Sequence, residues 1–356
     1  MSVLAAVLAV TAPATAEPTF AMAWFGRDGR LLVSVSPDGR GWAPPVRHGS
    51  LIRSANGPAL LFSSQYGWRV FWLTPDGARI GMSRGFGNAR RGVKFGPPRF
   101  VEVPAEHRPF QAPPVRPAAV FDGRRWVIAY SNRTPGRITV GRSGTRRGGG
   151  WTFETIEASR GWMTPPAIAH GNGAFLLAYA VPAPGGAELR MRRSPDGSRW
   201  SKPFKPRISG RTAEALSLAP VQGPVLAFAG GRFLLAVTNR RDKAAPRFLY
   251  RYDLSSSANG QEWSPLAGGF VAWSTTRAAV AMAVRPTGGC TLVAVSSSRP
   301  SGGLSARNIH IRHGVTRTDG CQRARTIRWA PLNAPFSVRS MLDRFVAVAY
   351  GNPHRR

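Results

Sequence analysis

Arginine is the residue type through which this chain could most readily do chemistry. The 356 residues include 49 basic and 17 acidic side chains, a formal net charge of +32, and all but four of the basic residues are arginines. A guanidinium group can hold a carboxylate through two parallel hydrogen bonds. The charge therefore leaves two interpretations open. It is either a solvated basic surface, or a surface that attracts a polyanion such as an acidic glycan, a cell-wall polymer, lipid headgroups or nucleic acid.

Other chemistries find little support in the sequence. The basic residues are spread over the whole chain, and no specific nucleic-acid motif accompanies them. Two of the six histidines, His310 and His313, are three residues apart, but on a predicted strand they face opposite sides, so no metal site is expected. The chain has no Gly-x-Ser-x-Gly elbow, P-loop or dinucleotide fingerprint, and we expect no cofactor.

The elements that must position these side chains are short strands in a long repeat. Six times, a turn rich in Gly, Asn or Asp precedes a run of aromatic and aliphatic residues. Each run follows another apolar strand and precedes a strand of alternating polarity, which predicts four strands per repeat. The lead residues lie 58, 49, 58, 59 and 53 positions apart; they are Trp68, Trp126, Phe175, Phe233, Leu292 and Phe345.

A second repeated feature is a turn motif of the form Ser-x-Asp/Asn-Gly-x-x-Trp. Its Ser and Asp or Asn can accept hydrogen bonds from backbone N–H groups, its Gly can take a positive φ, and its Trp can pack back over the turn. Weaker forms occur near Ser83, from Ser143 to Trp151 and from His313 to Trp329. The three clear copies consist of Ser36, Asp38, Gly39 and Trp42; Ser194, Asp196, Gly197 and Trp200; and Ser257, Asn259, Gly260 and Trp263.

Six four-stranded repeats predict an all-β fold, a six-bladed β-propeller of antiparallel blades. We expect the ring to close through a composite last blade. Its inner strands would be residues 336–341 and 345–350, and its outer strands would come from the N-terminal part, starting at residues 30–35. Residues 20–25 read as one more inner strand, which leaves seven blades as the alternative.

The N-terminus and the cysteines indicate export. Residues 1–16 form an apolar run that ends in Ala-Thr-Ala, a pattern typical of a signal peptide, and residues 17–356 would form one propeller domain. Cys290 and Cys321 predict a disulfide, with two free thiols as the alternative. No stretch approaches the ~18 apolar residues of a transmembrane helix. We therefore expect a secreted protein, periplasmic or extracellular, and favour a monomer.

The turn motif resembles the Asp-box, or bacterial neuraminidase repeat, of the sialidase-like β-propellers. The periodic pattern covers nearly the whole chain beyond residue 16, although the form found here is one residue shorter than the fuller family motif and one copy has Asn in place of Asp. The resemblance implies a sialidase-like propeller. It also implies that the boxes lie in outer hairpins, away from the active site, and serve the fold.

The resemblance implies a set of site residues as well. Sialidases hold the substrate carboxylate with three arginines, use a Tyr paired with a Glu as nucleophile, and use an Asp as acid/base. Glu214 and Tyr252 occur in a compatible order, and Asp28, Asp76, Asp122 and Asp343 are the spare acids. Four arginines fall at or just before predicted inner strands: Arg53, Arg116, Arg277 and Arg339.

The family's early Arg-Ile-Pro signature is absent from this chain. The favoured hypothesis is therefore a secreted propeller that binds an acidic glycan or another anionic ligand without catalysis. The alternative is a divergent exo-sialidase or related glycoside hydrolase that uses the arginines with the Tyr–Glu pair. A third hypothesis is a scaffold that presents its loops to protein partners.

Overall fold

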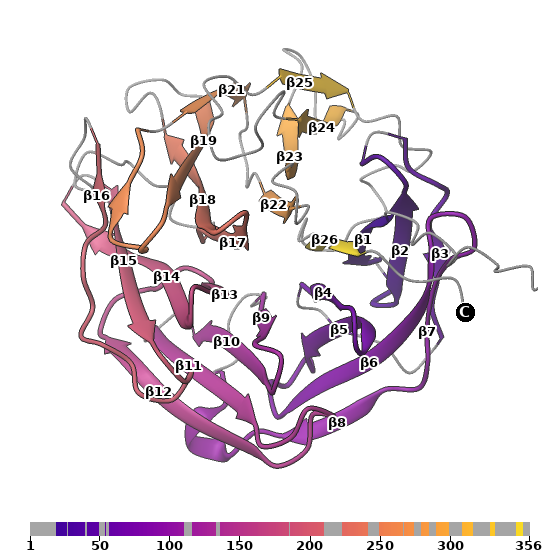
Figure 1. Cartoon of the computed structure of the whole chain (residues 1–356), viewed down its shortest axis with the longest axis horizontal. Coiled ribbons are helices and arrows are strands. Elements are labelled where there is room, and N and C mark those ends of the chain that lie inside the picture. Colours follow the sequence, from indigo (N-terminus) through magenta and orange to yellow (C-terminus); the bar gives the residue numbers. More distant parts are fainter. Residues whose placement is uncertain are drawn as a thin grey trace, which may run out of the picture.

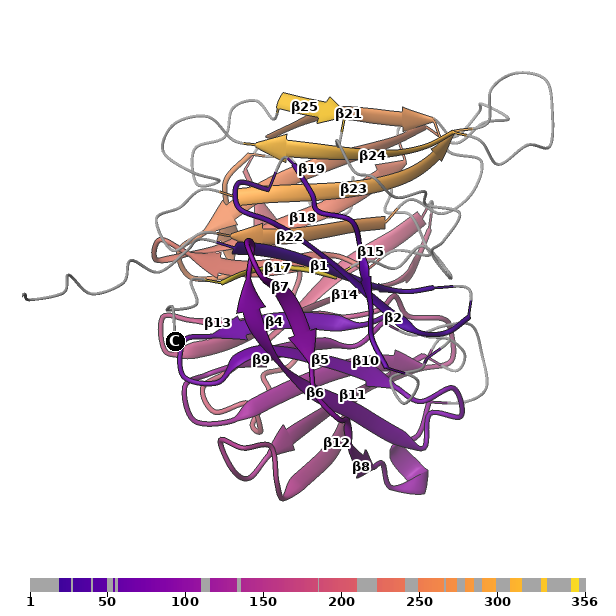
Figure 2. The same ribbon diagram turned by 90° about the vertical axis from the view of Figure 1, so that its right-hand side faces the viewer.

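The computed structural model describes a ring of antiparallel sheets (Figure 1). It describes residues 19–26, 28–39, 41–49, 54, 57–109, 116–132, 136–184, 186–209, 223–240, 249–265, 267–273, 279–284, 290–298, 308–315, 328–331 and 347–351. Within these residues the only helix is a 3₁₀ turn, η1 (Ala105–His107). Seen from the edge in Figure 2, the strands run across the thickness of the ring, roughly along its axis.

From the centre outward, the strands of the described residues form six antiparallel sheets. The first sheet contains β26 (Ala347–Gly351), β1 (Thr19–Phe25), β2 (Leu31–Ser36) and β3 (Val46–Arg47). The second contains β4 (Ala59–Ser63), β5 (Gly67–Leu73), β6 (Arg79–Asn88) and β7 (Gly92–Phe95), with β8 (Arg99–Glu102) also paired to β6. The third contains β9 (Ala118–Phe121), β10 (Trp126–Asn132), β11 (Gly136–Ser143) and β12 (Trp151–Ser159).

The remaining three sheets complete the ring. The fourth contains β13 (Ala167–Gly171), β14 (Ala174–Ala183) and β15 (Gly186–Ser194); the fifth contains β17 (Val225–Ala229), β18 (Arg232–Arg240), β19 (Leu249–Ser257) and β21 (Ala267–Trp273). The sixth contains β22 (Ala279–Val284), β23 (Cys290–Ser298), β24 (Asn308–Val315) and β25 (Arg328–Pro331). A short parallel pair, β16 (Arg207–Ile208) with β20 (Glu262–Trp263), links the edges of the fourth and fifth sheets.

The ring closes through a sheet that combines both ends of the chain, but its N-terminal strands begin earlier than expected. β1 pairs with β26, where Phe20 lies opposite Tyr350, and with β2 on its other edge. The first sheet thus takes one described strand from the C-terminal part and three from the N-terminal part. The N-terminal contribution starts at β1 and not at residues 30–35, so residues 20–25 are not left over, because a strand buried along its whole length suits this interior position. The expected strand over residues 336–341 lies outside the described residues.

Some predictions concern residues outside the described part of the chain. Residues 1–16 and 336–341 lie there, and so does Cys321, the expected disulfide partner of Cys290. The signal peptide and the disulfide therefore stay predictions. In the described part, no helix is long and apolar enough to cross a membrane.

The core lies between neighbouring sheets rather than within one central cluster. β5, β10 and β14 are almost fully buried. One cluster joins Trp68 and Trp72 of the second sheet to Phe25 of the first, and the next joins Phe71 to Trp126 of the third sheet. The second, third and fourth sheets thus bury both of their faces, which explains why these strands are apolar without alternation.

The Ser-x-Asp/Asn-Gly-x-x-Trp turns follow the third strand of their sheets, which is β2, β15 or β19. In all three copies the Ser Oγ accepts a hydrogen bond of 2.8 Å from the Gly N–H, and the Asp or Asn Oδ1 accepts one from a backbone N–H further along. The glycines have φ angles of 79°, 72° and 78°, which an L side chain rarely adopts. Trp42 and Trp263 also donate their Nε1–H to the Gly carbonyl.

These turns rest against the preceding sheet. A Cβ placed on Gly260 would lie 3.0 Å from Leu176 Cδ2 of β14, and one on Gly197 would lie 3.2 Å from Val127 Cγ2 of β10. Trp263 joins Leu176 in one buried cluster. The turns therefore hold neighbouring sheets together as well as closing their own hairpins.

We predict that Gly260→Ala destabilises the protein more than Gly173→Ala. Both glycines have a positive φ, 78° and 69°, which costs an Ala about 1–2 kcal/mol. Gly173 has open space around it, whereas Gly260 meets Leu176, so Gly260→Ala should cost about 1–3 kcal/mol more through overpacking. Urea denaturation measures the difference in unfolding free energy. Equal costs would show that the turn does not hold the two sheets together.

Candidate functional site

The residues expected to form a site are mostly outside the described part of the chain. Arg53, Glu214, Arg277 and Arg339 lie there. For Tyr252, the structure describes only the position of the backbone, on β19 opposite Phe270. Arg116 is described: it precedes β9, and burial lowers its pKa to about 10, so that it stays charged at neutral pH. The convergence of these six residues stays a prediction.

Three of the four candidate acids serve their own turns. Asp28 accepts a hydrogen bond from Arg30 N–H, Asp76 from Ala78 N–H and Asp122 from Arg125 N–H, at 3.1, 3.1 and 2.6 Å. Asp343 lies outside the described residues. The described acids are thus used as turn caps, in keeping with the preference of Asp for such positions.

A Tyr–Glu–Arg cluster does occur, but at a different place and with a different character. The Tyr179 hydroxyl on β14 donates to Glu157 Oε2 on β12 at 2.7 Å, and Arg192 on β15 donates to the same oxygen. Tyr179 is fully buried, and burial together with the Glu157 hydrogen bond raises the pKa of its hydroxyl. A nucleophilic phenol needs the opposite shift, so this cluster serves to join the third and fourth sheets.

We predict that Glu157→Gln destabilises the fold by about 3 kcal/mol, because it leaves the nearly buried Arg192 guanidinium without its counter-ion. Glu154, exposed on the same strand, provides the control: Glu154→Gln should change the unfolding free energy by less than about 0.5 kcal/mol. Chemical denaturation of both variants measures the difference. Similar stabilities would contradict the assigned role of Glu157.

The second sheet departs from the repeat at the position of its turn. Three sheets share a backbone hydrogen bond from the residue after the Trp: Ala43 N–H to Val35 O, Ser201 N–H to Arg193 O and Ser264 N–H to Ser256 O. In the second sheet, Gly96 N–H donates to Arg84 O in the same way. Gly85 therefore takes the place of the motif Ser, and Phe95 that of the Trp.

This correspondence reveals a longer hairpin. The Ser and Trp are six positions apart in the motif, as in 36 to 42, whereas Gly85 and Phe95 are ten apart. The four extra residues extend β6 and β7 beyond the ordinary turn, and neither Ser nor Asp is kept at the capping positions. The second repeat has thus given up its fold-stabilising turn for a longer hairpin, which marks the hairpin as a functional candidate.

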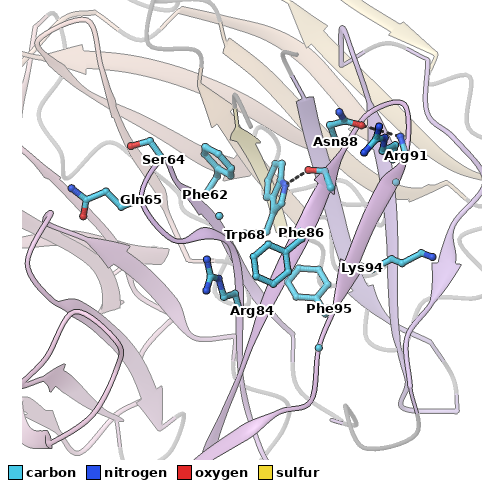
Figure 3. A pocket seen from close by; sticks show the side chains of 15 residues that line it. Phe62, Ser64, Gln65, Trp68, Arg84, Phe86, Asn88, Arg91, Lys94 and Phe95 are labelled. Carbon is cyan, nitrogen blue, oxygen red and sulfur yellow. Dashed lines mark hydrogen bonds between the residues drawn. The ribbon is translucent and has the colours of Figure 1, made fainter. Parts of the chain in front are cut away.

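The hairpin forms one wall of a cavity of about 630 Å³, which we call the β6–β7 groove. This volume is in the range of ligand sites. Figure 3 shows its side chains, with Phe86 and Phe95 beside Trp68 and with Arg84 next to the rings. The lining residues are Phe62, Ser64, Gln65, Gly67, Trp68, Arg84, Gly85, Phe86, Gly87, Asn88, Arg91, Gly92, Lys94, Phe95 and Gly96.

Buried hydrogen bonds fix the shape of the hairpin. Trp68 donates its Nε1–H to Gly87 O at 3.1 Å, and Asn88 Oδ1 accepts from the N–H groups of Arg90 and Arg91 at 3.1 and 2.9 Å (Figure 3). Gly87 has a φ of 123°, and a Cβ there would lie 1.9 Å from Gly92 O, so only glycine fits. The groove is therefore held in shape without a ligand.

The groove combines exposed aromatic surface with positive charge. Phe86 is 52% exposed, and the Arg84 guanidinium carbon lies 4.4 Å from the centre of its ring, a cation–π contact. Arg91 and Lys94 are exposed at the other side of the hairpin. Within the described part of the chain, the lining contains no Asp or Glu. Flat apolar rings can stack on a sugar, and the cations can hold carboxylate or sulfate groups on it.

The sequence contains a signal for this site that the turn motif alone does not reveal. The weak motif near Ser83 marks only the position of the repeat. The stretch that replaces it, from Arg84 to Gly96, alternates glycines with aromatic and basic residues. A fold motif lost in one repeat and replaced by such residues is the pattern that could have indicated the groove.

A second cavity, of about 460 Å³, lies among the inner strands β4, β9, β13, β17 and β22. Its described lining combines apolar side chains with the polar Ser63, Ser64, Gln65 and His170, and burial lowers the pKa of His170, so the ring is neutral at physiological pH. Among the described residues, neither an arginine nor a carboxylate lines it. The part of the chain that the structure describes also holds no group of three His, Cys, Asp or Glu residues able to bind a metal.

Comparison with known proteins identifies the fold. No family model and no curated protein matches the chain. The α-L-arabinanase of Penicillium chrysogenum, solved with arabinobiose, has a TM-score of 0.52 at 10% identity over 76% of this chain and 80% of its own. The GH93 α-L-arabinofuranosidase of Fusarium graminearum, solved with arabinobiose, has a TM-score of 0.50 at 12% identity over 91% and 83%.

These similarities define the class of the protein by its fold. The chain is an all-β protein whose antiparallel sheets have the arrangement of glycoside hydrolase β-propellers. Identities of 10% and 12% establish the shared fold and leave the activity to be argued from the site.

Proposed function

We propose that this protein is a secreted, sialidase-like β-propeller that binds an acidic glycan in the β6–β7 groove without cleaving it there. The observation that carries the proposal is the exposed Phe86 ring flanked by Arg84 in a preformed groove. An aromatic platform next to a guanidinium suits a sugar ring that bears a negative charge. The fold similarity to glycoside hydrolases solved with arabinobiose supports a carbohydrate ligand.

Binding rather than hydrolysis is proposed for the groove because of its side chains. Glycoside hydrolysis ordinarily requires two carboxylic groups, one of which protonates the leaving oxygen while the other attacks or activates water. Among the described residues, the groove lining has neither an Asp nor a Glu. Its arginines and lysine can neutralise charge on a ligand, but they cannot supply an acid with a suitable pKa.

The charge of the whole chain favours the same class of ligand. A net charge of +32 attracts polyanions over long distances and raises their encounter rate, whereas the groove supplies the close contacts. Attraction of this kind weakens as salt is added, because the Debye length falls to about 8 Å at physiological ionic strength. Stacking on Phe86 is much less sensitive to salt. Affinity in the groove should therefore fall with salt but persist at moderate ionic strength.

We predict that Phe86→Ala lowers the affinity for an acidic tetrasaccharide by about tenfold or more, since stacking on one aromatic ring contributes about 1–3 kcal/mol. Phe100→Ala is the matched control. Phe100, on β8 of the same sheet, is 42% exposed and also carries an arginine over its ring, but it lies outside the groove.

Isothermal titration calorimetry with hyaluronan, κ-carrageenan and maltose-type tetrasaccharides would compare carboxylated, sulfated and neutral ligands. We expect the wild type and Phe100→Ala to bind at least one acidic ligand at moderate salt and Phe86→Ala to bind it weakly. Absence of binding by the wild type to every anionic glycan would refute the proposal. Equal affinities of the two variants would place the ligand elsewhere on the protein.

A second candidate function is hydrolysis by a divergent exo-sialidase or related glycosidase, which the similarity to arabinan-degrading propellers favours. Its proposed residues are Glu214 and Tyr252, with Arg53, Arg116, Arg277 and Arg339 holding the substrate. We predict that turnover of a fluorogenic sialoside or arabinofuranoside is lost in both Glu214→Gln and Tyr252→Phe. A panel on which the wild type turns over no glycoside would exclude this function.

The finer features of the fold belong to the same proposal. We propose six blades rather than seven, since each of the six antiparallel sheets corresponds to one sequence repeat. The Ser-x-Asp/Asn-Gly-x-x-Trp turns are proposed to be Asp-boxes on the strength of their shared hydrogen bonds. Residues 1–16 as signal peptide, a disulfide between Cys290 and Cys321, and one monomeric domain over residues 17–356 complete the proposal.

A further inference from the structure

A buried arginine with no acidic partner among the described residues lies opposite Arg84, which lines the β6–β7 groove. Arg69, on β5, is only 9% exposed, and its Nε–H has no hydrogen-bond partner. Its guanidinium carbon lies 5.5 Å from the centre of the Trp126 ring, between the second and third sheets. Among the described residues, no Asp or Glu forms a salt bridge with it. An isolated charge in such a place is costly to the folded state.

The neighbours of Arg69 add to this charge rather than balance it. Arg84, on β6, is its direct partner across the two strands, so the two side chains leave the same face of the sheet. Arg99, on β8, is close enough to contribute further repulsion. Burial, Arg84 and Arg99 lower the pKa of Arg69 to about 10, so it remains charged at neutral pH. Like charges placed directly opposite each other are destabilising unless an anion lies between or beside them.

Arg84 connects this charge cluster to the groove. Its Nε–H donates to Tyr66 O at 3.0 Å, which fixes the side chain, and its guanidinium stacks on Phe86 within the groove lining. Arg84 is half-buried and lines the groove, whereas Arg69, its cross-strand partner, is buried next to it and does not itself line the groove. The Arg84 guanidinium therefore offers N–H donors at the aromatic platform, and the neighbouring Arg69 guanidinium lies over the Trp126 ring, which Tyr66 contacts edge-on.

We propose that Arg69 and Arg84 together bind one oxyanion group of the ligand, a carboxylate or sulfate on the sugar that stacks on Phe86. This inference rests on the proposed function of the groove and assigns the place of the ligand's negative charge. The ligand would supply the counter-ion that the fold lacks. Binding should then depend on the buried arginine as much as on the exposed one.

The test uses Arg69→Met in the full chain. Met keeps the length and apolar packing of the side chain over Trp126 and removes its charge. Because the buried charge has no acidic partner among the described residues, we expect the unliganded variant to be at least as stable as the wild type. A role of Arg69 in the fold alone would give the opposite result. Arg147→Met, at an exposed position in the third sheet, removes the same charge and is the control.

The first readout is thermal denaturation with sodium sulfate against sodium chloride at equal ionic strength. We expect sulfate to raise the Tm of the wild type and of Arg147→Met by about 2 °C more than that of Arg69→Met. Equal increments in all three proteins would overturn the oxyanion site, whatever the glycan experiments show. This measurement needs no knowledge of the natural ligand.

The second readout is the affinity for the acidic tetrasaccharide that binds best. We expect Arg69→Met to weaken it at least about tenfold, while Arg147→Met changes it less than about twofold. Hyaluronan and κ-carrageenan fragments separate a carboxylate from a sulfate as the bound group. If Phe86→Ala loses affinity and Arg69→Met keeps it, glycan binding in the groove stands and the oxyanion site is wrong.

Discussion

The structure depends on the apolar faces that neighbouring sheets bury against each other. A single sheet of this protein would expose two apolar faces, and only the neighbouring sheets can cover them. The ring is therefore stable only when it is closed, and the pairing of β1 with β26 closes it. That pairing joins segments more than 320 residues apart in the chain, since Phe20 lies opposite Tyr350. The hydrogen bonds of these strands also remove the two free edges that an open ring would leave.

Within the closed ring, the repeated turns stabilise the fold and do not form a ligand site. Each clear copy stabilises its own hairpin, and the copies with Gly197 and Gly260 also pack on the preceding sheet, so their residues have little freedom to change. The second sheet shows what becomes possible when the turn is lost. Its longer hairpin is held by Trp68 and Asn88 instead of Ser and Asp, and the space beside it is a groove rather than packed core. The proposed ligand site is thus a local replacement of a stabilising motif.

The charged residues are divided in the same way, because some stabilise the fold and others form the proposed site. Several described acids are engaged in the fold, with Asp76 and Asp196 in turns and Glu157 between sheets. With 17 acidic residues for 49 basic ones, few carboxylates are left to neutralise surface arginines. Arg69 and Arg84 show this shortage of carboxylates most clearly, since they lie side by side on neighbouring strands and have no acidic partner among the described residues. A basic composition becomes a specific site only where the fold brings such groups together.

The sequence by itself determined the all-β class, the repeat of about 55 residues and the turn hydrogen bonds, because these depend on local spacing and on the preferences of Gly, Ser and Asp. Only the tertiary structure decided that β1 lies inside the closing sheet, that Tyr179 and Glu157 pair between sheets, and that Arg69 lies opposite Arg84 on the neighbouring strand. Those relations join residues on different strands or in different repeats. They depend on strand register and on packing between sheets, which no spacing along the chain records.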